Sequence, residues 1–135
     1  MYASTTQLRV RYGETDQMKI VYYGNYANYF EVGRVESIRQ LGYSYKQMEA
    51  DGIIMPVVET HIRYLRSAVY DDLLTIKTTL KELPRNHRIE FYQEVFNEEN
   101  KLLTAGRVVL YFLDARTRTK MHMPGKLREK LEGYF

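Results

Sequence analysis

The residue best placed to do chemistry is Asp16, which ends the polar turn Gly13-Glu14-Thr15-Asp16 a few residues ahead of a predicted helix. The first N–H groups of a helix lack partners within it and carry a partial positive charge. They can stabilise the oxyanion that forms when an acyl carbonyl is attacked, and a nearby carboxylate can attack that carbonyl or activate water. This spacing predicts acyl-transfer chemistry. The alternative, commoner on spacing alone, is that Asp16 only caps a turn.

Other familiar catalytic motifs are absent. The sequence has no GxSxG nucleophile elbow, no Walker loop and no GxGxxG motif. His61, His87 and His122 are too far apart in sequence for paired metal ligands, and such isolated histidines are more often surface residues. With no cysteine, a thiolate nucleophile, thiolate metal ligands and disulfides are excluded. We therefore expect no metal and no cofactor.

The hydrophobic pattern predicts one strand before this turn and one long helix after it. From Thr5 to Tyr12, polar and apolar residues alternate, which is typical of a strand buried on one face. From Asn25 to about Leu41, aromatic and small residues recur at helical spacing, and Gly42 can end this helix in a left-handed conformation. Gly33 and Ser37 lie in the apolar stripe, where their small size would let a sheet approach the helix axis.

The rest of the chain predicts four further strands and two short helices. β-Branched and aromatic residues alternate over four segments separated by turn residues: Pro56 to Leu65, Asp72 to Leu83, His87 to Asn97 and Lys101 to Asp114. Consecutive strands of this kind pair antiparallel in a meander, and one helix can cover one face, which is an α+β arrangement. The short helices are expected at Tyr45 to Ala50 and Gly125 to Gly133. At 135 residues, a single domain spanning 1–135 is expected.

Composition narrows the class of partner and compartment. The chain is 44% hydrophobic and 27% charged, as expected of a folded globular domain. Its 20 Lys and Arg are interspersed with 17 Asp and Glu, giving a net charge of +3 without a long basic block. Nucleic acid is therefore not an expected partner. The N-terminus lacks the apolar run of a signal peptide, and no stretch approaches the ~20 apolar residues of a membrane span, so a cytoplasmic location is expected.

The stretch from Tyr12 to Tyr26 resembles the signature of the 4-hydroxybenzoyl-CoA thioesterase branch of the hotdog superfamily. In that signature, an Asp is followed after four residues by Val-Tyr or Val-Phe, and after two more by Asn-Tyr at the start of the central helix. Asp16, Val21-Tyr22 and Asn25-Tyr26 have this spacing. The segment from Tyr64 to Asp72 is similar to the family's Tyr-x-x-Pro-Ala-x-x-Asp-Asp pattern. The resemblance covers nearly the whole chain.

This resemblance implies a hotdog fold, in which a five-stranded antiparallel sheet wraps around one long central helix. It also implies hydrolysis of an acyl-CoA thioester to a free acid and CoA. Asp16 would be the nucleophile or the general base, and the backbone N–H of Tyr23 would hold the carbonyl oxygen. Tyr22, Asn25 and Tyr26 would shape the turn and the acyl pocket. Both a direct attack by Asp16 and an attack through water remain open.

The resemblance further assigns charged residues and an oligomeric state. Glu31 matches an acidic position of the family helix and would approach the active site; the alternative is a surface pair with Arg34. Relatives join their sheets edge to edge as homodimers and commonly pair again as homotetramers, so both states are open. CoA phosphates would be held by cations, often across the subunit boundary, although each cation alone could be a solvated surface charge. The candidates are Arg85, Arg88, Arg116, Arg118 and Lys120.

Three positions depart from patterns seen in relatives. Tyr23 stands where many relatives of one bacterial subgroup have His, so a histidine base is not available there. Ser67 stands where relatives have Pro, and Lys19 where they have Gly. Because glycine takes backbone angles that lysine avoids, Lys19 would alter the loop that frames the substrate.

Two other functions stay open on the sequence. One is a hotdog hydratase or dehydratase acting on a β-hydroxyacyl thioester; those relatives pair a catalytic histidine with an acid, and no histidine lies near Asp16. The other is a non-catalytic acyl-CoA-binding protein. A carrier-protein thioester could also replace CoA, since both present a pantetheine arm, and the acyl group itself is not specified by the sequence.

Overall fold

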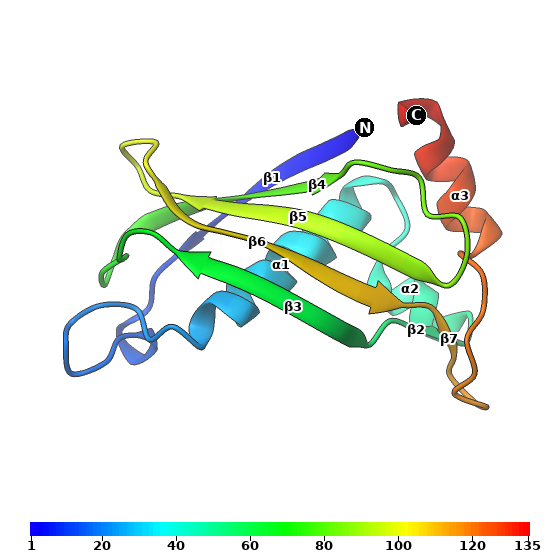
Figure 1. The fold of residues 1–135 in the computed structure, drawn as a ribbon, viewed down its shortest axis with the longest axis horizontal. Helices are drawn as coiled ribbons and strands as arrows, with labels where there is room; N and C mark the ends of the chain where they lie inside the picture. Colours follow the sequence, from blue (N-terminus) through cyan, green and yellow to red (C-terminus); the bar gives the residue numbers. More distant parts are fainter.

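The computed structural model describes residues 1–135 and shows an antiparallel sheet wrapped around one long helix (Figure 1). The five strands lie in the order β1 (Tyr2–Arg9), β4 (Leu73–Leu80), β5 (Arg88–Phe96), β6 (Leu102–Tyr111) and β3 (Val57–Tyr64). The predicted long helix is α1 (Asn25–Gln40), and it crosses the inner face of the sheet (Figure 1). The α+β hotdog architecture predicted from the sequence is confirmed.

Smaller elements close the ends of the sheet. Strands β2 (Ile53–Ile54) and β7 (Leu113–Asp114) form a separate two-stranded sheet that the sequence pattern did not predict. The helices α2 (Tyr45–Ala50) and α3 (Gly125–Leu131) form at the two predicted positions, and a short 3₁₀ turn follows α3. No helix is long and apolar enough to cross a membrane.

The predicted meander order is wrong for β3. This strand does not pair with β4, which follows it in the chain, but with β6, where His61 lies opposite Arg107. β4 has β1 on one side and β5 on the other, so no edge remains for β3. The chain therefore passes from β3 at one edge of the sheet to β4 near the other edge, and β3 is left with one unpaired side.

The predicted strand from Thr5 to Tyr12 is displaced toward the N-terminus. β1 ends at Arg9, and a 3₁₀ turn covers Tyr12–Glu14. The chain turns here because the Glu14 carboxylate accepts hydrogen bonds from the backbone N–H (2.9 Å) and the Nε (2.8 Å) of Arg11. Tyr12, expected on the buried face, is 78% exposed as a result.

The helix and the sheet touch most closely at Gly33. A Cβ added there would lie 2.7 Å from the side chains of Ile76 and Thr78 and 2.8 Å from Gln93 Nε2, so only glycine fits. Gln93 is fully buried and donates to the carbonyl of Phe30 (2.8 Å) and to Thr78 Oγ1 (3.0 Å). The predicted close approach at a small residue is thus confirmed, and this contact fixes α1 on the sheet.

Candidate active site

Asp16 opens a tight turn ahead of α1. Its backbone N–H donates to the carbonyl of Ile20 (2.9 Å), and its carbonyl accepts from the N–H of Lys19 (2.9 Å). The half-buried carboxylate accepts one hydrogen bond in the chain, from the backbone N–H of Met18 to Oδ1 (2.8 Å). Asp16 therefore caps its own turn, as the alternative interpretation predicted, and its Oδ2 has no partner within the chain.

Lys19 has a left-handed backbone, with φ of 66°. This is the conformation that glycine adopts easily and that costs other residues roughly 1–2 kcal/mol. The departure noted at this position is therefore accommodated by strain in the lysine backbone. The bridge between Thr15 and Val21 closes the loop on either side of the turn.

Glu14 joins this loop to α1 through both its side chain and its backbone. Its carboxylate accepts from the hydroxyl of Tyr29 (2.8 Å) in addition to Arg11. Its carbonyl accepts from the backbone N–H of Tyr22 (3.0 Å) and from the side-chain amide of Asn25 (2.8 Å). Burial raises the pKa of Glu14, but the hydrogen bonds from Arg11 and Tyr29 outweigh burial and hold this pKa below its usual value.

The N-terminus of α1 presents two backbone N–H groups without a partner. The N–H of Asn25 donates to the carbonyl of Tyr22 (2.9 Å), and the N–H of Tyr26 donates to that of Tyr23 (3.2 Å). The N–H groups of Tyr23 and Gly24 donate to no group of the chain, and no side chain caps the helix. Such a helix end can hold an oxygen that carries negative charge.

A small pocket of about 150 Å³ lies at this end of α1. The ring of Tyr64 packs edge-on, with its centroid 6.1 Å from that of Tyr23 and 5.6 Å from that of Tyr26. Burial raises the pKa of Tyr26 above its usual value. The wall combines aromatic and aliphatic side chains, as ligand pockets do. It comprises Ile20, Val21, Tyr23, Tyr26, Tyr64, Leu65, Arg66 and Ser67.

Tyr22 lies close to both Asp16 and Tyr23. Its ring centroid lies 4.7 Å from that of Tyr23. The pKa of Tyr22 is raised above its usual value, first by the neighbouring Tyr23 hydroxyl and to a smaller degree by the negative charge of Asp16. The carboxylate of Asp16 therefore lies close enough to act electrostatically on Tyr22, three residues before α1.

Glu31 is exposed on α1 and forms no ion pair with Arg34. Arg34 turns inward instead; it is 5% exposed and donates to Gln93 Oε1 (3.1 Å). Burial lowers the pKa of Arg34, and the nearby negative charge of Glu31 is one of the smaller effects that raise it. The surface pair with Arg34, which was the alternative to a place near the active site, is not formed, and the Glu31 carboxylate has no partner in the chain.

The predicted phosphate-binding cations gather at one end of the molecule. The backbone N–H of Phe112 donates to the carbonyl of His87 (2.8 Å), which places the β4–β5 connection beside the segment around β7. Arg85 of this connection and Arg88, the first residue of β5, border a hollow of about 280 Å³. The predicted cations at this end are Arg85 and Arg88, in and directly after the β4–β5 connection, and Arg116, Arg118 and Lys120, after β7.

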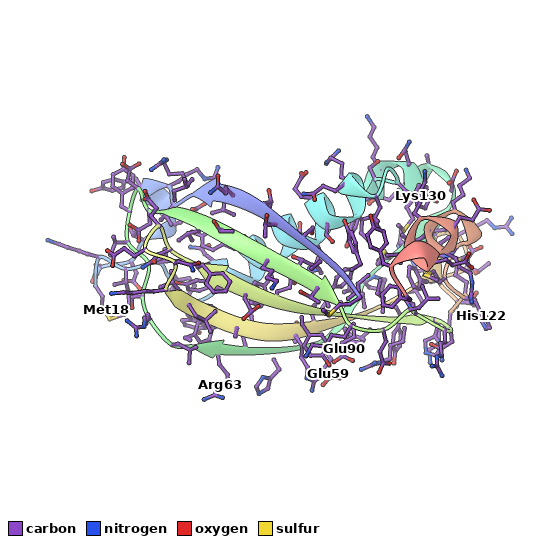
Figure 2. All side chains as sticks on the ribbon, turned by 90° about the horizontal axis from the view of Figure 1, so that it is seen from above. Met18, Glu59, Arg63, Glu90, His122 and Lys130 are labelled. Carbon is purple, nitrogen blue, oxygen red and sulfur yellow. The ribbon has the colours of Figure 1, made fainter.

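These cations lie at the opposite end of the folded molecule from Asp16. Figure 1 shows the loop before α1 at one end of the sheet and the β4–β5 connection, with the segment after β7, at the other. Figure 2 shows the same separation, with Met18 of the Asp16 turn at one extremity and His122 at the other. One chain thus brings Asp16, Tyr22, Tyr23 and the start of α1 together, but not the cations.

Sequence reasoning missed Glu14 and Tyr29 as parts of this site. The available signal was that Glu14 is a second acid two residues before Asp16, although nothing local showed that Tyr29 would reach it. Tyr64 was also missed as a pocket residue. No three His, Asp or Glu side chains come together as metal ligands, so no metal site is assigned.

Comparisons with known proteins agree with this architecture. Residues 10–131 match the Thioesterase-like superfamily model. YneP of Bacillus subtilis (strain 168) is 40% identical over 61% of this chain and 59% of its own length. The long-chain acyl-CoA thioesterase FadM of Escherichia coli (strain K12) is 30% identical over 94% of this chain and 96% of its own.

Among solved structures, the DHNA-CoA thioesterase from Staphylococcus aureus has a similar fold. It superposes with a TM-score of 0.86 and is 36% identical, over 100% of this chain and 85% of that one. The match of the superfamily model to most of the chain, the full-length relative and the shared fold lead to one conclusion. This chain belongs to the Thioesterase-like superfamily of hotdog proteins.

Proposed function

We propose that this protein hydrolyses an acyl-CoA thioester to a free acid and CoA at the N-terminus of α1. The observation that carries the proposal is the pair of unpartnered N–H groups of Tyr23 and Gly24, which adjoin a small apolar pocket and the loop of Asp16. Relatives named for thioester hydrolysis of different acyl-CoA substrates, FadM and the DHNA-CoA thioesterase, support this reaction class.

In the proposed mechanism, the thioester carbonyl lies at the end of α1 with its oxygen toward the N–H of Tyr23. Asp16 uses its free Oδ2 to attack the carbonyl carbon or to take a proton from a water that attacks it. When Asp16 attacks directly, the carbon–sulfur bond breaks to release the CoA thiolate and leaves an acyl–Asp16 anhydride, which a water hydrolyses to the free acid while a proton of that water passes to the thiolate. When water attacks, the proton that Asp16 takes up passes to the sulfur as the carbon–sulfur bond breaks, and CoA leaves as the thiol. The backbone N–H group stabilises the oxyanion without having to move, because Asn25 and Tyr26 already fix the first turn of the helix.

The aromatic residues have different proposed tasks. Tyr26 and Tyr64 form the wall against which the acyl group packs, and Tyr22 supports the ring of Tyr23 beside the Asp16 turn. Asn25 holds the loop through its hydrogen bond to Glu14. Glu31 projects from the exposed side of α1, where a bound substrate or a second subunit would meet it.

We further propose that the active form is a homodimer joined through β3. The alternative is a homotetramer in which two such dimers pair. β3 has one unpaired edge, and Val57 and Val58 on it are 49% and 46% exposed. In an antiparallel pairing of two β3 strands, the Asp16 end of one subunit faces the cationic end of the other. The cations of the second subunit, Arg85, Arg88, Arg116 and Arg118, would then lie beside the first subunit's pocket, where they bind the phosphates of CoA.

The test of the proposed function is thiol release from a panel of aromatic, short-, medium- and long-chain acyl-CoA substrates. Release from at least one of them supports hydrolysis. Loss of enoyl-thioester absorbance without thiol release would favour the hydratase. Tight CoA binding with no turnover of any substrate would favour a binding protein. The same assay with acyl-carrier-protein thioesters distinguishes the two pantetheine carriers.

A further inference from the structure

We infer that Glu14 is a positioning residue that holds the Asp16 loop and the Tyr23 amide in one fixed arrangement, through its contact with Tyr29. The inference rests on the proposed function. It names a task for a carboxylate that does not itself reach the substrate, and it makes the hydroxyl of Tyr29 a functional group of the site.

The backbone half of this arrangement fixes the two reacting groups relative to each other. Glu14 is two residues before Asp16, and its carbonyl accepts from the N–H of Tyr22, the residue directly before Tyr23. The same carbonyl accepts from the side-chain amide of Asn25, the first residue of α1. Any shift of Glu14 therefore moves the base of the Asp16 turn relative to the peptide that carries the Tyr23 N–H.

The side-chain half ties Glu14 to the core. Tyr29 is 3% exposed, and its ring packs against that of Tyr26, with centroids 5.5 Å apart. Its hydroxyl reaches out of the core to Glu14 Oε1 (2.8 Å). Arg11 occupies Glu14 Oε2 through its Nε (2.8 Å), so both carboxylate oxygens are held. The side chain of Glu14 is thus anchored to α1 by a partly buried contact, in addition to the Asn25 contact with its backbone.

The contact between Tyr29 and Glu14 should affect the rate more than the stability, because it sets the positions of the reacting groups. Misplacing reacting groups by about 1 Å can cost roughly 100-fold in rate, while a single hydrogen bond contributes only about 1 kcal/mol to stability. Removing the Tyr29 hydroxyl should therefore lower turnover far more than it lowers stability. A residue with a merely structural task would show the reverse.

The test compares Tyr29→Phe with Tyr43→Phe. Tyr43 is also buried (5% exposed) and donates a 2.7 Å hydrogen bond to a carboxylate, Asp51, but it lies in the segment between α1 and α2, away from the pocket. Both changes remove one hydroxyl and leave the ring. We expect similar small losses in Tm for the two variants. For Tyr29→Phe, kcat should fall about tenfold or more while KM stays nearly unchanged, whereas Tyr43→Phe should keep the wild-type kcat.

A second measurement asks whether Tyr29 acts through Glu14. In a Glu14→Ala background, Tyr29→Phe should cause no further loss of kcat, because the contact is already gone. Wild-type kcat in Tyr29→Phe, or the same loss in both backgrounds, would overturn the inference while leaving acyl-CoA hydrolysis intact. An inactive wild-type protein would instead overturn the proposed function on which the inference rests.

Discussion

A Cβ at Gly33 would lie 2.7 Å from the Thr78 hydroxyl oxygen, so the helix and the sheet meet at a point where no side chain fits. Gly33→Ala should therefore force α1 away from the sheet and destabilise the fold by about 1–3 kcal/mol or more, as overpacking does. Gly125→Ala, at the start of α3, is the control, since a Cβ there meets nothing within 4 Å. Urea unfolding of both variants is the measurement; equal stabilities would show that the contact is not tight.

Lys19→Gly should stabilise the protein. Relief of the left-handed lysine backbone gains roughly 1–2 kcal/mol, and the added flexibility of glycine in the unfolded chain takes back about 0.5–1 kcal/mol. Lys46→Gly, within α2, should instead lose about 1 kcal/mol, because glycine is a poor helix residue there. Opposite changes in Tm are expected, and a loss of stability at both positions would rule out strain at Lys19.

The Tyr43–Asp51 hydrogen bond should make stability depend on pH at both extremes. The bond to Tyr43 holds the pKa of Asp51 below its usual value of about 3.9, so its contribution is present above that pH and is lost as pH falls below it. Burial, with the bond to Asp51, raises the pKa of Tyr43 to about 12, so that contribution is present below about pH 10 and is lost as pH rises from 10 toward 12.

The difference in unfolding free energy between wild type and Tyr43→Phe should accordingly be constant between about pH 4 and 10 and shrink outside this window. Denaturant titrations at closely spaced pH values measure it directly. A difference that stays constant from pH 3 to 12 would mean that neither group titrates differently in the folded protein.

Lysines on the open edge of β3 should prevent subunit pairing. A Val57→Lys, Val58→Lys double variant places two charges on the proposed subunit boundary, where burying them is costly. Sedimentation velocity should then show a monomer, and thiol release by this monomer should be reduced. Val69→Lys is the control, because Val69 is similarly exposed (45%) but lies outside the strand; an unchanged mass in the double variant would place the interface elsewhere.

The sequence predicted the parts of the fold that depend on local patterns. The bounds of α1, the left-handed Gly42 after it (φ 90°) and four of the five long strands lie close to their predicted places. The position of β3 beside β6 was not predicted, because periodicity says which residues form strands and not which strands meet. Tyr12 was misplaced because the Arg11–Glu14 contact ends the strand early.

In the candidate site, too, the sequence predicted the local features but not the contacts between distant residues. Asp16 and the start of α1 follow from a contiguous motif, whereas the contact between Glu14 and Tyr29 joins residues 15 apart and depends on the path of the loop. The inward turn of Arg34 was equally hidden, since a helix surface pair with Glu31 was sterically as reasonable. The cations at the far end can reach the site only from a second subunit. The residue pattern of one chain does not show how two subunits pair.

The central claim is that Asp16 reacts at the end of α1, and Asp16→Asn tests it most directly. Asparagine keeps the side chain's size, and its carbonyl oxygen can still accept from the N–H of Met18, so the turn and Tm should be preserved. Thiol release from the best acyl-CoA substrate should fall by at least about 100-fold, since a nucleophile or general base contributes that much or more. A folded Asp16→Asn protein with wild-type kcat would contradict the account.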